Sequence, residues 1–86
     1  MKTLLEIAKL VEDKMVTLYR EAGENEVDMS YCFKQSSVTI EILYPKHVHK
    51  LLSELLAMSN QLKCESHIAD YKLSISSSRL KVSLFQ

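Results

Sequence analysis

The stretch that decides the fold is residues 26–43, which read EVDMSYCFKQSSVTIEIL. Every second residue from Val27 to Phe33 is apolar, and after a short polar loop the same alternation runs from Val38 to Ile42. An apolar period of two predicts β-strands, and two such runs around a polar loop predict an antiparallel hairpin with one buried face.

An amphipathic helix precedes this hairpin. Thr3 and Glu6 have the spacing of a capping box, in which the hydroxyl and the carboxylate each accept from the other residue's backbone N–H. Apolar residues then recur at spacings of three and four from Leu4 onward, and Gly23 supplies the left-handed residue that often ends a helix. The sequence therefore predicts a helix over 3–22.

The second half of the chain repeats this order. Pro45 stands where a helix favours its first residue, since the missing N–H would be unpaired there anyway. Leucines at helical spacing follow, which predicts a helix over 45–62. Beyond Lys63 the period of two returns on both sides of three consecutive serines, so a second hairpin is predicted over 66–85.

These elements predict a single domain, 1–86, of the α+β class. The expected architecture is an αββαββ two-layer sandwich, with a four-stranded sheet that carries both helices on one face. Right-handed crossovers favour a circularly permuted ferredoxin-like arrangement, with strands 37–43 and 79–85 in the middle and strands 26–34 and 66–76 at the edges. A plain meander order is the alternative.

Composition excludes several classes of protein. The chain has 86 residues, of which 47% are apolar, and 11 basic side chains balance 11 acidic ones. A single Gly excludes glycine-rich phosphate loops, and two Cys exclude a disulfide framework. No stretch is apolar enough for a signal peptide or a membrane span, and free thiols favour a reducing compartment, so a cytoplasmic protein without a membrane partner is expected.

Residues that commonly carry chemistry are few. His47 and His49 are two residues apart and would point to different sides of a helix, whereas Cys64 and His67 have the spacing of half a zinc site. A zinc or thiol site built on Cys32, Cys64 and His67 is the third hypothesis, after the two binding functions described below. No pattern resembles a nucleophile held by a base, so we expect no catalytic residue, no metal and no cofactor.

Charge is distributed unevenly between the two halves. Residues 1–43 carry a balance of −3 and residues 44–86 a balance of +3, which suits oriented pairing with a second copy or with a charged partner. On the outer sheet face, four basic side chains could contact phosphates, which makes an RNA- or DNA-binding module the alternative function. They are Lys34, Lys72, Arg79 and Lys81.

The main hypothesis is a small non-enzymatic protein-binding regulator or inhibitor that acts through a sheet edge or the outer sheet face. Accessory proteins of phages and mobile elements are one class of such scaffolds. The third strand, over 67–76, is the expected open edge, through which a homodimer could also form. The alternation is expected to expose the apolar residues Leu43, Ile68 and Phe85. Together with Tyr71, they are the candidate partner-binding residues.

Overall fold

In the computed structural model, which describes residues 1–86, helix α1 (Leu4–Glu21) begins at the predicted capping box. The Thr3 N–H donates to Glu6 Oε1, and the Glu6 N–H donates to Thr3 Oγ1, both at 3.1 Å. The hydrogen bond from the Thr3 backbone lowers the pKa of the Glu6 carboxyl. Gly23 follows the helix with a φ of 82°, a value that glycine adopts without steric cost.

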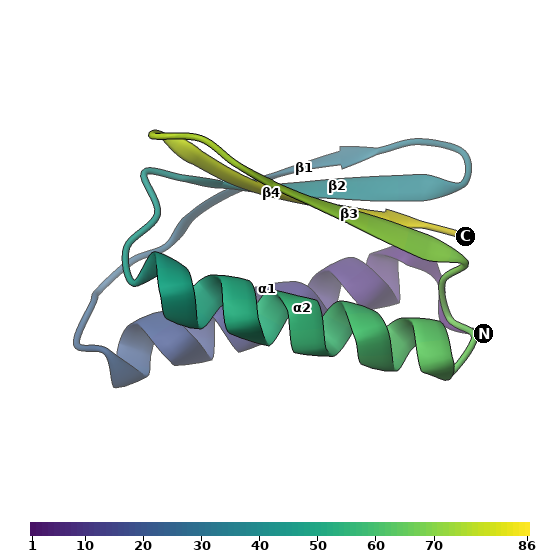
Figure 1. Ribbon diagram of the computed structural model, residues 1–86, viewed down its shortest axis with the longest axis horizontal. Helices are drawn as coiled ribbons and strands as arrows, with labels where there is room; N and C mark the ends of the chain where they lie inside the picture. Colours follow the sequence, from purple (N-terminus) through teal and green to yellow (C-terminus); the bar gives the residue numbers. More distant parts are fainter.

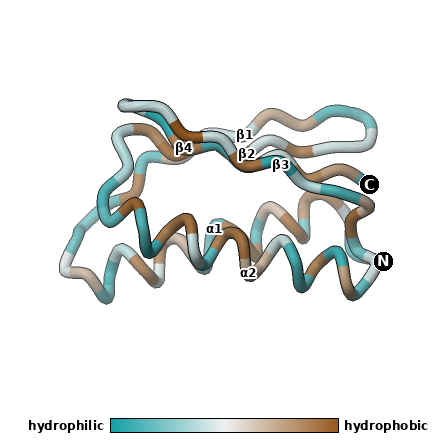
Figure 2. The backbone as a smooth tube through the Cα atoms, in the orientation of Figure 1, coloured by the Kyte–Doolittle hydropathy of each residue, from teal (hydrophilic) through white to brown (hydrophobic).

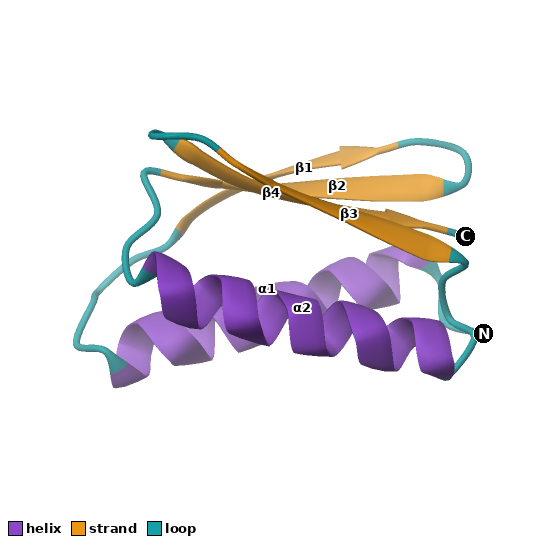
Figure 3. Cartoon of the chain, in the orientation of Figure 1, coloured by secondary structure: helices purple, strands orange, loops and turns teal.

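Four strands form one antiparallel sheet in the order β1-β2-β4-β3. They are β1 (Asp28–Phe33), β2 (Ser37–Leu43), β3 (Asp70–Ile75) and β4 (Arg79–Phe85). This order confirms that the second and fourth strands lie in the middle, and it rules out the meander. Both helices lie on one face of the sheet, as Figures 1 and 3 show, so the predicted α+β fold is confirmed.

Helix α2 (Val48–Cys64) begins three residues later than Pro45 and ends two residues later than predicted. The placement of Pro45 at the first helical position was therefore wrong. Residues 44–47 instead form a connection that is anchored to the loop after α1. The Lys46 N–H donates to the Tyr19 hydroxyl at 2.8 Å, and Glu24 accepts from Lys46 Nζ at 3.1 Å. These contacts hold the connection beside the loop after α1, and α2 begins directly after it.

The core lies between the helix layer and the two central strands. Hydrophobic positions recur along both helices and along the sheet in Figure 2. Inward residues of β2 and β4 are almost completely buried, and so are the helix residues that face them. The largest of these side chains are Ile7, Met15, Ile40, Ile42, Leu51, Leu55, Leu80 and Leu84. Neither α1 nor α2 combines the length and the apolar character that a bilayer-spanning helix needs.

The edge strand β1 departs from the prediction of a fully buried inner face. Tyr31 and Phe33 share this face with Met29, yet their exposed fractions are 37% and 48%. Neighbouring helices pack about 8–10 Å apart, whereas neighbouring strands lie about 4.8 Å apart, so two helices cover the middle of a four-stranded sheet more fully than its edges. The end of β1 therefore projects beyond the cover that α1 provides.

Two expectations about the third strand were wrong. It has six residues rather than about ten, because residues 65–69 turn back toward the helix layer. The His67 N–H donates to the Leu62 carbonyl at 2.9 Å, and Ser66 has a φ of 62°. This turn directs Ile68 into the core, where only 4% of the residue is exposed, so Ile68 is not a surface residue.

Candidate protein-binding edge

The inner face of β1 carries exposed aromatic side chains beside an exposed leucine of α1. The rings of Tyr31 and Phe33 lie 6.4 Å apart at an angle of 20°, so they form a stacked pair. Leu5, on the first turn of α1, is 70% exposed. Together they border a shallow hollow of about 120 Å³, which is lined by Leu5, Ala8, Lys9, Glu12, Tyr31 and Phe33. We call this surface the β1 groove.

The backbone of β1 presents unpaired groups directly above the β1 groove. The Lys34 N–H donates to the Ser37 carbonyl at 2.8 Å, which makes this a hydrogen-bonded pair of the β1–β2 ladder. Such pairs alternate along antiparallel strands, so Ser30 and Cys32 also bond to β2. The N–H and C=O groups of Met29, Tyr31 and Phe33 consequently point to the open edge. An open edge next to exposed apolar side chains is a template for strand addition.

The opposite edge, β3, is less open. By the same alternation Tyr71 directs its N–H outward, but this group donates to Asp70 Oδ1 at 2.8 Å. The Tyr71 hydroxyl also donates to Asn60 Oδ1 on α2, and Lys72 places a charge near the middle of the strand. Polar cover and edge charge both oppose strand addition. The structure therefore favours β1 over the edge that the sequence suggested.

Electrostatics around the β1 groove give a prediction for Tyr31. Burial of the hydroxyl, followed by the negative charges of Glu12 and Asp13, raises the pKa of Tyr31 to about 12. The pKa of Tyr31 in the folded chain is therefore higher than its value near 10 in the unfolded chain. The contribution of this group to the stability of the fold is fully present below pH 10 and is lost as pH rises toward 12. We expect the difference between the ultraviolet tyrosinate titrations of wild type and Tyr31→Phe to have its midpoint near pH 12.

Circular dichroism at each pH provides the control, because unfolding would expose all tyrosines at once. A difference titration with a midpoint near the ordinary value of 10.0, in a chain that is still folded, would contradict this placement of Tyr31.

The predicted partner-binding residues do not form one surface. Leu43 and Phe85 both lie on the outer sheet face but at opposite ends, because Leu43 pairs with Arg79 and Phe85 pairs with Ser37. Tyr71 lies on the inner face, half-buried against α2, and Ile68 is in the core. Phe85, which is 40% exposed, is the exposed one of the four.

The residues of the nucleic-acid hypothesis share the outer face with acidic groups. Arg79 Nη1 lies 2.7 Å from Glu41 Oε1, so this guanidinium already has a carboxylate partner. Lys72 and Lys81 are diagonal neighbours across β3 and β4, and Lys34 lies in the β1–β2 turn. Binding to RNA or DNA stays a prediction that salt-sensitive mobility shifts would test.

The thiols and histidines are distributed over different parts of the structure. Cys32 is exposed on β1, and Cys64 is exposed at the end of α2. His67 Nδ1 accepts from the Lys2 N–H at 3.0 Å, a contact that ties the first residues to the turn before β3. No group of three or more His, Cys, Asp or Glu side chains lies close enough together to hold a metal ion.

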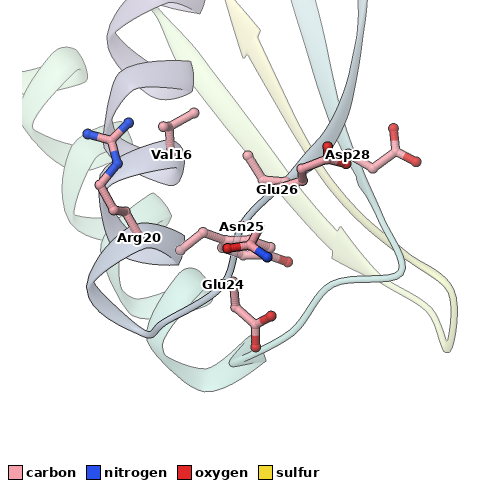
Figure 4. A pocket seen from close by; sticks show the side chains of 8 residues that line it. Val16, Arg20, Glu24, Asn25, Glu26 and Asp28 are labelled. Carbon is pink, nitrogen blue, oxygen red and sulfur yellow. The ribbon is translucent and has the colours of Figure 1, made fainter.

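An open depression of about 570 Å³ lies beside the loop that follows α1. In Figure 4 the charged ends of Arg20, Glu24 and Asp28 point in different directions rather than toward one point. Glu24 is instead part of the scaffold, since Lys46 Nζ and His47 Nε2 lie 3.1 and 3.3 Å from its carboxylate. The hydrogen bond from Lys46, followed by that from His47, lowers the pKa of Glu24.

The opposite charges of the two halves are partly used inside the molecule. Three ion pairs that involve Lys or Arg join residues 1–43 to residues 44–86, at distances between 2.7 and 3.4 Å. They are Lys14–Glu54, Glu24–Lys46 and Glu41–Arg79. The last two pairs join an acidic side chain of the first half to a basic side chain of the second, so part of the charge difference is used within one chain.

Sequence reasoning missed the β1 groove although its signals were present. The alternation placed Tyr31 and Phe33 with the core, and it gave no measure of how far the helices cover that face. Leu5 lies outside the helical stripe that begins at Leu4, Ile7 and Ala8, so it was an apolar residue without an assigned contact. Comparison with models of protein families, with curated proteins and with solved structures finds no match to this chain.

Proposed function

We propose that this chain is a small non-enzymatic protein-binding regulator or inhibitor that takes an extended segment of a partner protein as an added strand along β1. The observation that carries the proposal is the open edge of Met29, Tyr31 and Phe33 above exposed aromatic rings. In strand addition the backbone groups supply affinity and alternate side chains supply specificity.

The geometry indicates the chemistry of the partner segment. Its inward positions would lie beside Tyr31, Phe33 and Leu5, so they should be apolar or aromatic at every second residue. Its outward positions would face Asp28 at one end of β1 and Lys34 at the other. The proposed ligand is thus an extended segment with alternating apolar residues and with opposite charges at its two ends. Free thiols at Cys32 and Cys64 support action in a reducing compartment such as the cytoplasm.

Panning a random-peptide display library against the full chain tests the proposal. We expect the enriched peptides to have alternating apolar residues. Amide hydrogen exchange with a synthetic enriched peptide should then show new protection at Met29, Tyr31 and Phe33, because their N–H groups gain acceptors. Ser30 and Cys32 serve as internal references, since β2 already protects their N–H groups.

The matched control is the other edge, where Leu73 and Ile75 also direct their N–H groups outward. Their exchange rates should not change. Protection at Leu73 and Ile75 without protection at Tyr31 would assign the function to β3 and overturn the proposal for β1. A library from which no alternating peptide emerges would also count against it.

A further inference from the structure

The chain itself carries a segment with the properties expected of the ligand. Along β1, apolar Met29, Tyr31 and Phe33 alternate with outward residues, and the strand is flanked by Asp28 at its start and Lys34 just beyond its end. Because an antiparallel partner runs in the opposite direction, an acidic residue at one end and a basic residue at the other make the strand complementary to itself.

We infer that two copies of this chain pair through β1, antiparallel about a two-fold axis at Tyr31, and so join their sheets into one. The hydrogen-bonding pattern restricts the register, because the edge-facing groups belong to Met29, Tyr31 and Phe33 and must oppose one another. With Tyr31 opposite the partner's Tyr31, Met29 lies opposite the partner's Phe33. The whole of β1 is then paired.

Charge and complete pairing of the strand together favour this register over its neighbours. It places Asp28 opposite the partner's Lys34, and the two-fold axis makes this pair occur twice. A shift by two residues in one direction leaves Asp28 opposite the partner's Ser36. In the other direction Lys34 lies opposite the partner's Glu26, beyond the start of β1, and Phe33 has no opposing residue of the strand. The acidic groups beside Tyr31 are partly neutralised within each copy, since Lys9 lies 3.9 Å from Glu12 and 3.5 Å from Asp13.

In the registers that pair most of the strand, the β3 edge lacks the same complementarity. Antiparallel pairing about Leu73 would place Asp70 opposite the partner's Ser76, so no opposite charges would meet. Two features therefore distinguish β1: apolar side chains that project beyond the helix layer, and charges that match under a two-fold axis. Since a partner protein would use the same edge, self-pairing would compete with it. Only this competition rests on the proposed function.

Disulfide trapping tests the register. In it, Ser30 on the outer face opposes the partner's Cys32 in a non-hydrogen-bonded pair, where Cα atoms are about 4.5 Å apart and a disulfide can close. We expect Ser30→Cys, in a Cys64→Ser background, to form a linked dimer under mild oxidation. The background alone should form no linked dimer, nor should Ser30→Cys combined with Cys32→Ser, because each has a single thiol on β1 that would face a serine.

Charge exchange tests the same pairing without a new covalent bond. Asp28→Lys and Lys34→Asp each place like charges opposite each other twice, so each should raise the dimer dissociation constant about tenfold in sedimentation equilibrium. The double variant Asp28→Lys/Lys34→Asp should restore the wild-type value, and all of these residues are exposed, so folding should be unaffected.

A wild-type chain that stays monomeric at every concentration, or equal trapping of all cysteine variants, would overturn the dimer. Peptide binding by such a monomer would leave the proposed function intact. A trapped dimer in a chain that binds no peptide, even at concentrations at which it is monomeric, would support the dimer and contradict the proposed function.

Discussion

Ile40→Ala should lower the free energy of unfolding by about 2–5 kcal/mol, the range for truncating a large aliphatic side chain in a core that relaxes only partly. Ile40 lies in the middle of β2 and is 1% exposed. Its cross-strand neighbours are Tyr31 on β1 and Val82 on β4, so its side chain forms the centre of the row that faces the helices. Urea denaturation followed by circular dichroism measures the change.

The size of this loss matters because the domain is small. At about 0.05–0.15 kcal/mol per residue, a chain of this length has a stability of roughly 4–13 kcal/mol. A loss in the predicted range lowers the melting temperature by about 8–40 °C, since each kcal/mol shifts a domain of this size by about 4–8 °C.

Ile75→Ala is the matched control for Ile40→Ala. It removes the same atoms from the end of β3, where Ile75 is 50% exposed, and should cost less than about 1 kcal/mol. Equal losses in the two variants would mean that the central row does not dominate the core.

Local signals in the sequence were sufficient for the six elements, whereas the order of the strands rested on the handedness of crossovers and left a meander as the alternative. The capping box at Thr3 and Glu6 is a contact between near neighbours, so its spacing alone predicted its geometry. The alternation in β2 and β4 likewise predicted which residues face the helices. Elements that begin or end through distant contacts were predicted less well. The start of α2 depends on hydrogen bonds from residues 46–47 to Tyr19 and Glu24, which no local pattern contains.

The binding edge expected from the sequence differs from the edge that the structure leaves most open. A sheet edge was expected, and the length of the third strand pointed to β3. That length was overestimated because the turn before β3 buries Ile68, and Asp70 takes the outward N–H of Tyr71. For β1, periodicity showed the direction of each side chain. The exposed fraction depends on how far α1 extends beneath the strand, which is a property of the packed layers.

The double variant Tyr31→Lys/Phe33→Lys should abolish strand addition while the fold persists. Both rings are partly exposed already, and the lysine stems can cover part of the same apolar surface, so the loss of stability should be only about 1–2 kcal/mol. Binding should suffer far more. Two aromatic anchors at about 2 kcal/mol each correspond to a loss of affinity of more than about 100-fold for an enriched peptide.

Titration calorimetry with the peptide measures this affinity, and urea denaturation measures the stability of the same preparations. The control Ser74→Lys/Ile75→Lys adds the same charge to exposed positions on β3, and it should bind the peptide as the wild type does. Since both variants carry two new lysines, general repulsion would weaken both, whereas loss of the β1 groove weakens one. Undiminished binding by Tyr31→Lys/Phe33→Lys would show that the aromatic rings do not contact the ligand, and the proposed role of β1 would then be wrong.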